Sequence, residues 1–249
     1  MVTRDTDQQA TRGIVLRKIP YGEADEIVTC LLQKIGVVTF FASGSRKSKK
    51  RFAGCLDYFR HLLFHYTVAR QGMWRLHRVE ETDNPTRLAV WEATSHFAFA
   101  SFLAELICDF VPPVAGDHEL YELWLDLEQN LAGHPLGITT TIEYLIRLFE
   151  LTGYGPNLTH CHHCQKDASE TPLYFDERQG QGICPQCDVS PLSVHALQRP
   201  LIERVRRGQK QMFSEPNQGR AFLRQLVLFS ENIRQKRSPS GVFFLETLL

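Results

Sequence analysis

Two pairs of cysteines late in the chain have the spacing of a metal site. The pairs are Cys161-x-x-Cys164 and Cys184-x-x-Cys187, with nineteen residues between them. Each Cys-x-x-Cys turn directs two thiolates at one ion, and the segment between the pairs must return the chain to complete a tetrahedron. The spacing predicts one Zn²⁺ held by Cys161, Cys164, Cys184 and Cys187. Four thiolates leave no coordination position for water or substrate, so we expect this zinc to be structural.

The residues around the cysteines fit a small ribbon but leave other chemistry open. Residues 173–175 are predicted as a short strand, and Gly180 and Gly182 allow a reversal before Ile183. His160, His162 and His163 lie beside the first pair, and an imidazole can replace a thiolate. Such neighbours are more often exposed or support the ligands, so they are left out of the predicted set. A redox-active pair or disulfides are the alternatives to zinc.

The remaining cysteines and the hydropathy indicate a chain of the reducing cytoplasm. Cys30, Cys55 and Cys108 stand alone in apolar surroundings, which predicts buried free thiols. No apolar run follows Met1, so we expect no secretory signal. The most apolar stretch, residues 98–111, is interrupted by two carboxylates and is predicted to be a core helix and not a membrane span.

The net charge of the chain is zero, but its segments differ in the sign of their charge. The chain has 28 Lys and Arg and 28 Asp and Glu. Residues 1–83 carry +5 and residues 193–249 carry +6, whereas residues 84–160 carry −8 and residues 161–192 carry −3. A polyanion responds to the field within a Debye length of ~8–10 Å and not to the total charge. Phosphate contacts are therefore expected at the two basic ends.

Residues 11–80 read as short strands separated by turns. The apolar segments are 13–19, 27–32, 37–42, 61–68 and 73–79. Five β-rich segments, with no long helical pattern between them, predict a small closed barrel of the oligonucleotide-binding (OB) type. An SH3-like barrel is the nearest competitor, because strand count alone does not separate the two.

A run of cations lies between the third and fourth predicted strands. It consists of Arg46, Lys47, Lys49, Lys50 and Arg51. Positive charges this dense repel one another unless water or an anion screens them. A solvated loop without a ligand is the plain alternative. The place of the run on a barrel with further cations favours phosphate, so we assign these residues to a nucleic-acid backbone.

Other candidate contacts are assigned more weakly. Further phosphate contacts are expected from Arg17, Lys18 and Lys34 on the barrel and from a second basic segment, Arg204, Arg206, Arg207 and Lys210. One or two of the barrel aromatics are candidates for stacking on bases, and most of them are expected in the core. These aromatics are Phe40, Phe41, Phe52, Tyr58, Phe59 and Trp74.

From Asn84 onwards the pattern becomes helical. Apolar residues at i, i+3 and i+4 predict helices ending at Phe110, over 119–131 and 138–151, and later over 194–207 and 220–237. Gly153 is the expected cap of the third helix. The predicted fold is α+β and multidomain. It has an OB barrel over 1–83, a helical domain over 84–158 and 193–249, and an inserted four-cysteine zinc ribbon over 159–192.

Several stretches resemble one bacterial family. Residues 21–25 before a strand, 44–47 and 51–54 around the basic run, 151–156 before the cysteines and 237–245 at the end resemble the DNA repair proteins of the RecO family. The order of barrel, helical domain with inserted ribbon and last helix covers nearly the whole chain and is more specific than any one motif. Gln165 and Asp188 depart from the glycines common in zinc knuckles. Some relatives lack the cysteines, which implies that zinc stabilises and does no chemistry.

The resemblance implies a recombination mediator and not an enzyme. Proteins of this family bind single- and double-stranded DNA, anneal complementary strands, contact SSB, and cooperate with RecR to load RecA. DNA, RecR, SSB and indirectly RecA are therefore the implied partners, in a cytoplasmic, nucleoid-associated location without membrane contact. Annealing needs no nucleophile, because neutralising the phosphates of two strands lets base pairing proceed.

Other classes of protein fit the sequence less well than a mediator. A zinc-containing interaction adaptor that does not bind DNA directly is the alternative. A nucleobase deaminase is disfavoured because the chain has no His-x-Glu motif. A nucleotide-driven motor is disfavoured because the chain has no Gly-x-x-x-x-Gly-Lys-Ser/Thr loop.

Overall fold

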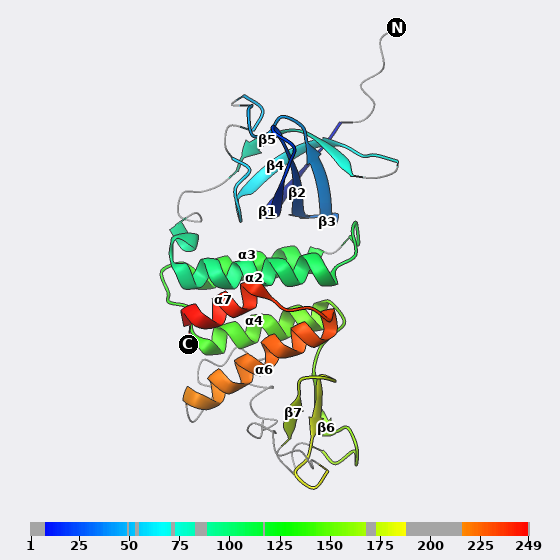
Figure 1. The fold of residues 1–249 in the computed structure, drawn as a ribbon, viewed down its shortest axis with the longest axis vertical. Helices are drawn as coiled ribbons and strands as arrows, with labels where there is room; N and C mark the ends of the chain where they lie inside the picture. Colours follow the sequence, from blue (N-terminus) through cyan, green and yellow to red (C-terminus); the bar gives the residue numbers. More distant parts are fainter. Residues whose placement is uncertain are drawn as a thin grey trace. The chain divides into compact units, whose positions relative to one another are not determined.

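The computed structural model describes residues 8–48, 50–52, 55–70, 73–82, 89–116, 118–167, 173–187 and 216–248. The chain divides into two compact units, Met1–Gly133 and His134–Leu249 (Figure 1). Across the described ranges, no helix combines the length and the apolar character that a membrane crossing requires.

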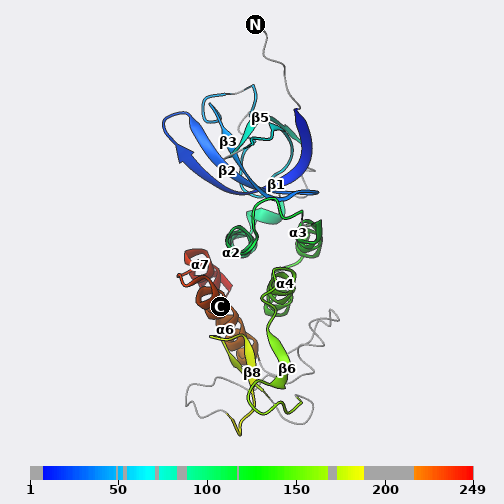
Figure 2. The ribbon, with the colours of Figure 1, turned by 90° about the vertical axis from the view of Figure 1, so that its right-hand side faces the viewer.

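The first unit begins with a closed five-stranded barrel (Figure 2). Its strands are β1 (Gln9–Tyr21), β2 (Asp25–Leu32), β3 (Gly36–Ala42), β4 (His61–Thr67) and β5 (Trp74–Glu81). All the predicted strands are confirmed, and β1 is longer at both ends than its apolar stretch. The greater length of β1 follows from its pairing, because the first part of β1 pairs with β4 and the second part with β2.

The strand order decides between the two candidate barrels. The strands follow one another as β1-β2-β3-β5-β4, and β4 returns to β1. Successive strands are antiparallel except β3 and β5, which are parallel at Phe40 opposite Trp74 and Phe41 opposite Arg75. This Greek-key order defines an OB barrel, as predicted, and excludes the SH3-like alternative.

Two segments outside the strands complete the closure. β3 and β5 pair over two residues of each strand, so the backbone N–H and C=O groups along the rest of their facing edges need other partners. The Val114 and Gly116 N–H groups donate to the carbonyls of Val37 and Ile35, each at 2.9 Å. The Val79 N–H donates to the Arg51 carbonyl at 3.1 Å. The loop that holds the basic run is therefore part of the barrel wall.

Alternation along the strands fills the barrel with apolar side chains. Its core includes Val15, Val28, Cys30, Val38, Phe40, Phe64, Tyr66 and Leu76. Cys30 and Cys55 are buried and outside any disulfide, as expected, and Cys108 is half-buried. Burial raises the pKa of the Cys30 thiol well above its ordinary value, so this residue behaves as a small apolar side chain.

One end of the barrel meets three helical elements. These are the 3₁₀ turn η1 (Val90–Glu92), α2 (Thr94–Phe110) and α3 (His118–Leu131). The buried Phe59 ring lies 5.4 Å from Trp91, 5.2 Å from Phe97 and 5.4 Å from Trp124, measured between ring centroids. Phe59 has a φ of 63°, an uncommon conformation for a bulky residue. The aromatic contacts hold this conformation and dock the helices on the barrel.

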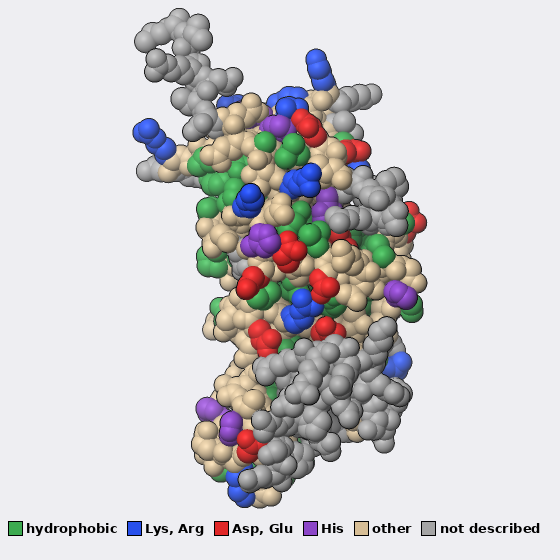
Figure 3. Space-filling view, turned by 180° about the vertical axis from the view of Figure 1, so that it is seen from behind, with side chains coloured by type: hydrophobic (Ala, Val, Ile, Leu, Met, Phe, Trp, Pro, Cys, Tyr) green, Lys and Arg blue, Asp and Glu red, His purple; other side chains and the backbone are tan. Residues whose placement is uncertain are grey.

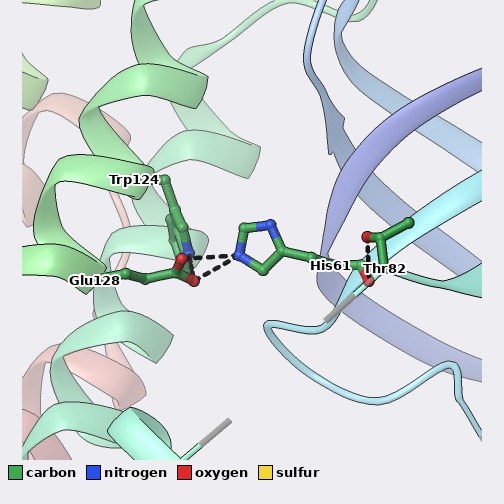
Figure 4. Close-up of polar contacts among 4 residues, drawn as sticks. All are labelled: His61, Thr82, Trp124 and Glu128. Atoms are coloured by element: carbon green, nitrogen blue, oxygen red, sulfur yellow. Dashed lines mark hydrogen bonds and ion pairs between the residues drawn. The ribbon is translucent and has the colours of Figure 1, made fainter. Parts of the chain in front are cut away.

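A buried polar contact lies beside this aromatic cluster (Figure 4). His61 Nε2, from β4, lies 2.7 Å and 2.9 Å from the two carboxylate oxygens of Glu128 on α3. The Trp124 Nε1–H donates to Glu128 Oε1 at 3.1 Å. The side chains of His61 and Glu128 are 5% and 3% exposed, so neither group has water as a ready substitute partner.

The second unit contains three described helices and a small sheet. The helices are α4 (Ile138–Leu151), α6 (Pro216–Arg234) and α7 (Pro239–Leu248). The strands β6 (Asn157–Cys161), β7 (Tyr174–Asp176) and β8 (Gln181–Ile183) pair in the order β6-β8-β7. Gly153 ends α4 as predicted, with a φ of 83°, and its N–H donates to the Glu150 carbonyl at 3.2 Å.

The helix predictions differ from the structure mainly at the ends of the helices. α3 begins one residue before the predicted start, α4 has the predicted bounds, and α6 covers Pro216–Arg234 in place of 220–237. The chain around Val90–Glu92 is a 3₁₀ turn, so the α-helix itself begins at Thr94. The predicted helix start at Asn84 and the helix over 194–207 lie outside the described residues.

The buried His61–Glu128 contact generates a stability prediction. His61→Ala leaves the Glu128 carboxylate buried without its main partner and is expected to lower the free energy of unfolding by about 3–5 kcal/mol. The double change His61→Leu with Glu128→Leu removes both ionisable groups and is expected to recover part of that loss, because the Trp124 Nε1–H then loses its acceptor. Urea unfolding followed by tryptophan fluorescence measures this, because Trp74, Trp91 and Trp124 all lie in the first unit.

Glu23→Ala is the control, because Glu23 is an exposed carboxylate with one long contact, to Lys47 Nζ at 4.0 Å. It is expected to leave the unfolding midpoint unchanged. A His61→Ala protein as stable as the wild type would show that the contact contributes nothing.

Candidate nucleic-acid interface and metal centre

The basic loop is attached to the corner between β1 and β2. The Gly44 N–H donates to Asp25 Oδ1 at 2.7 Å, and the Ser45 hydroxyl donates to Glu26 Oε2 at 2.7 Å. The Arg46 N–H donates to the Ala24 carbonyl at 3.0 Å. Hydrogen bonds to ionised carboxylates are stronger than neutral ones. These contacts give the loop a defined start and explain why the 21–25 and 44–47 stretches occur together.

The loop cations that the structure describes are exposed. Arg46, Lys47, Lys50 and Arg51 are all exposed, and Lys49 lies outside the described residues. Arg51 Nη2 donates to the Ser43 carbonyl at 2.8 Å, and its guanidinium lies 5.1 Å from the Phe52 ring centroid. Arg51 therefore helps to shape the loop. Among the described cations, Lys50 and Lys47, which has a 4.0 Å contact with the exposed Glu23, are more available to a ligand.

The other predicted cations are not gathered at the loop. Lys18 Nζ donates to Asp57 Oδ1 at 2.6 Å and to the Leu56 carbonyl at 2.9 Å. Arg17 is exposed in the middle of β1, and Lys34 lies in the β2–β3 turn, at the other end of that hairpin from the loop. Figure 3 shows the Lys and Arg side chains of one barrel face dispersed among acidic and His side chains. Arg204, Arg206, Arg207 and Lys210 lie outside the described residues.

The barrel aromatics are divided between core and surface. Phe40, Phe52 and Phe59 are buried, Phe41 and Trp74 are half-buried, and Tyr58 is exposed with Lys18 Nζ 5.4 Å from its ring centroid. Sequence reasoning overlooked Tyr21, the most exposed of the barrel aromatics described, at 55%. The available signal was its place in Pro20-Tyr21-Gly22, a turn at the end of the predicted strand, since turns lie on the surface.

The four cysteines come together in the second unit. One ligand atom from each of Cys161, Cys164, Cys184 and Cys187 lies within 4.8 Å of all the others. Cys164 Sγ and Cys184 Sγ are 3.6 Å apart, too far for the ~2.05 Å bond of a disulfide. A tetrahedron with Zn–S bonds of ~2.3 Å has sulfurs ~3.8 Å apart. The arrangement therefore fits a four-coordinate ion, and this set within the described residues contains no histidine.

The backbone around the four cysteines also fits a metal site. Cys161 ends β6, and the Cys184 N–H donates to Cys161 Sγ at 3.3 Å. Cys161 and Cys184 are buried against Leu173. Gly182 makes this packing possible, because a Cβ there would lie 2.6 Å from Leu173 Cδ1. Gln165, where a glycine is common, has the left-handed φ of 60°, and its side-chain amide donates to the His162 carbonyl at 3.0 Å.

The thiols perturb one another strongly. Burial, the largest single influence, raises the pKa of Cys161, but backbone N–H groups led by that of Cys164 outweigh it and lower the value to about 6. Hydrogen bonding with Cys164, and then with Cys184, raises the pKa of Cys187 to about 12. Several thiolates cannot be accommodated so close together without a cation. The donor set is therefore chemically suited to a divalent metal with soft ligands.

The fold and the two candidate sites together define a class of protein. The chain is an OB-fold protein with a basic loop attached to the barrel and a separate four-cysteine module on a small sheet.

Comparison with known proteins identifies the family. The family model described as "Recombination protein O N terminal" matches residues 7–85, and that described as "Recombination protein O C terminal" matches residues 93–226. A "DNA repair protein RecO" of Myxococcus xanthus is 30% identical over 195 residues, covering 78% of each chain. One of Dehalococcoides mccartyi is 26% identical over 246 residues, covering 96% of this chain and 95% of the relative. The chain belongs to the RecO family of DNA repair and recombination proteins.

The contacts at the β1–β2 corner predict how the basic loop responds to a nearby substitution. Asp25→Ala removes the carboxylate that accepts the Gly44 N–H, so the loop opens more often. Trypsin cleavage after the loop cations is expected to be about tenfold faster, given the strength of a hydrogen bond to a charged group. Mass spectrometry of timed digests measures this rate. Glu92→Ala, an exposed carboxylate on η1 and not on this corner, is the control and is expected to cleave at the wild-type rate. Equal rates in all three proteins would show that Asp25 does not hold the loop.

Proposed function

We propose that this protein is a recombination mediator. It binds single- and double-stranded DNA, anneals complementary strands, and acts with RecR to load RecA onto DNA coated with SSB. The observation that carries the proposal is the attached basic loop of the OB barrel, whose Lys47 and Lys50 are exposed and whose first residues are hydrogen-bonded to Asp25 and Glu26. OB barrels commonly bind single strands through a charged groove and adjoining loops.

The proposed chemistry requires no catalytic group. Two complementary strands repel one another through their phosphates, and cations that neutralise both lower that barrier. Base pairing then supplies the free energy of annealing. The protein's contribution is a set of positive charges held where a strand can reach them, and we assign Arg46, Lys47, Lys49, Lys50 and Arg51 to this role. Arg17, Lys18, Lys34 and the segment with Arg204, Arg206, Arg207 and Lys210 are weaker assignments. Lys18 is the weakest barrel assignment because Asp57 already neutralises it.

The four cysteines are proposed to hold a structural Zn²⁺. Support comes from the closeness of the sulfurs and from the N–H that already donates to Cys161 Sγ. A closed thiolate site would hold β6 and β8 together by fixing Cys161 and Cys184, and it would leave no open position for substrate. The partner-binding surfaces for RecR and SSB are not assigned to residues.

Binding to single-stranded DNA tests the proposal. Fluorescence anisotropy of a labelled oligonucleotide is expected to show binding whose log K falls linearly with log salt. Lys47→Gln with Lys50→Gln is expected to weaken binding and to reduce the slope by ~0.7 for each phosphate that the variant no longer neutralises. The control is Lys166→Gln with Arg178→Gln, which makes the same charge change in the acidic segment 161–192 and leaves both quantities unchanged.

If the wild type binds no DNA even at low salt, the mediator function fails and the zinc-containing adaptor becomes the better interpretation. In that case the loop variants would keep whatever protein contacts the wild type makes.

Metal content provides a separate test. The purified protein is expected to contain about one zinc per chain by elemental mass spectrometry, and Cys161→Ser is expected to lose it. Cys108→Ser, outside the cluster, is the control and retains the metal. Chelation is expected to expose β6 to β8 to amide exchange while the unfolding of the first unit, followed by tryptophan fluorescence, stays unchanged. A metal-free protein whose mass shows two disulfides would contradict the assignment.

A further inference from the structure

The outer face of the barrel carries a row of apolar side chains that is separate from the basic loop. In the strand register Ile19 lies opposite Ile27, and Ile27 lies opposite Phe41. Cross-strand partners share a face, and the neighbouring Val28 and Phe40 are buried, so this row points outward. Ile19, near the end of β1, is 40% exposed. The row spans three strands, which is about 10 Å at the usual strand spacing.

Tyr21 extends this row. Its ring centroid lies 5.8 Å from that of Phe41, with an angle of 85° between the ring planes. Tyr21 is on β1 and Phe41 on β3, so the tyrosine reaches across β2. At 55% exposure, it leaves more than half of its surface to solvent. Tyr21, Phe41, Ile19 and Ile27 together form what we call the outer apolar row.

Cations border the outer apolar row. Arg17, exposed, is two residues along β1 from Ile19. Arg75, also exposed, is the register partner of Phe41 on β5. Arg46 Nη1 lies 3.5 Å from the carbonyl of Gly22, the residue after Tyr21.

The carboxylates at this corner are largely occupied. Asp25 accepts the Gly44 N–H and Glu26 accepts the Ser45 hydroxyl, while Glu23 lies 4.0 Å from Lys47. An apolar strip bordered by guanidinium groups suits a ligand with flat apolar faces and a negatively charged backbone.

We propose that the outer apolar row is a base-stacking platform for single-stranded DNA. Bases would stack on Tyr21 and Phe41 while phosphates lie against Arg17 and Arg75. The inference rests on the proposed DNA-binding function and adds a second surface to it, distinct from the basic loop. The occupant is a single strand and not a duplex, because paired bases are stacked on one another and offer no free face. Stacking through the flat face would leave the pairing edge of each base open to a complementary strand.

The test compares single-stranded and duplex DNA with Tyr21→Ala. Stacking of one base on an aromatic ring corresponds to about a 5- to 150-fold difference in affinity. Tyr21→Ala is expected to weaken single-strand binding in that range, to leave duplex binding unchanged, and to keep the wild-type salt slope, since no charge is removed. Arg17→Gln, in contrast, is expected to lower the slope. Tyr21→Phe keeps the ring and is expected to bind as the wild type does.

An abasic oligonucleotide, which has no bases to stack, adds a second comparison of the wild type with Tyr21→Ala. Without bases the wild type and Tyr21→Ala are expected to bind equally, so the cycle of two proteins and two ligands isolates the stacking contribution. Tyr154→Ala is the matched control, because Tyr154 is 41% exposed but lies in the second unit.

The outcomes separate the two proposals. No binding of DNA by the wild type overturns the proposed function itself. Wild-type binding with an unaffected Tyr21→Ala overturns the platform alone. An equal loss for single strand, duplex and abasic strand would indicate a general disturbance of the barrel and would also overturn it. A change in oligomeric state by size-exclusion chromatography, without a change in DNA affinity, would overturn the platform and assign the face to an interface between copies of the chain.

Discussion

The closure of the barrel through a two-residue parallel pair is the constraint on which the first unit depends. β3 and β5 meet at Phe40 and Phe41, and beyond that point each edge would carry unpaired backbone groups. Val114 and Gly116 satisfy the start of β3, while Arg51 satisfies β5 through Val79. The segment after α2 and the basic loop are therefore structural parts of the wall as well as connections.

This constraint places charge on a loop that is hydrogen-bonded to the barrel. A loop that contributes a backbone carbonyl to a barrel strand, and whose first residues bind two carboxylates, has a limited choice of conformations. Its cations then face a ligand with less conformational entropy to lose than those of a free loop. A strand of nucleic acid that crosses from the loop to the outer apolar row would meet cations first and stacking surface second. In such an arrangement the loop cations would supply an affinity that falls with salt. The outer apolar row would distinguish single strands from duplexes.

Local patterns predicted much of this molecule, and the exceptions have physical reasons. The alternation of apolar residues located the five strands, and cysteine spacing identified the four thiols that lie together. The strand order was inferred only as one of two barrels, because pairing of β1 with β4 joins residues far apart in the chain. The engagement of Lys18 by Asp57 has no local signature, nor has the packing of Tyr21 against Phe41. The turn of helix at η1 was read as part of α2, since both share the same apolar spacing.

The His61–Glu128 contact joins a strand of the barrel to a helix 67 residues further along the chain. Removal of either group alone deprives the other, which is buried, of this contact, whereas two apolar side chains of suitable volume would fit together. Among relatives the two positions are therefore expected to change as a pair. A sequence without the histidine should also be without the glutamate. The docking of α3 on the barrel is therefore expected to appear as covariation of these two positions in an alignment of relatives.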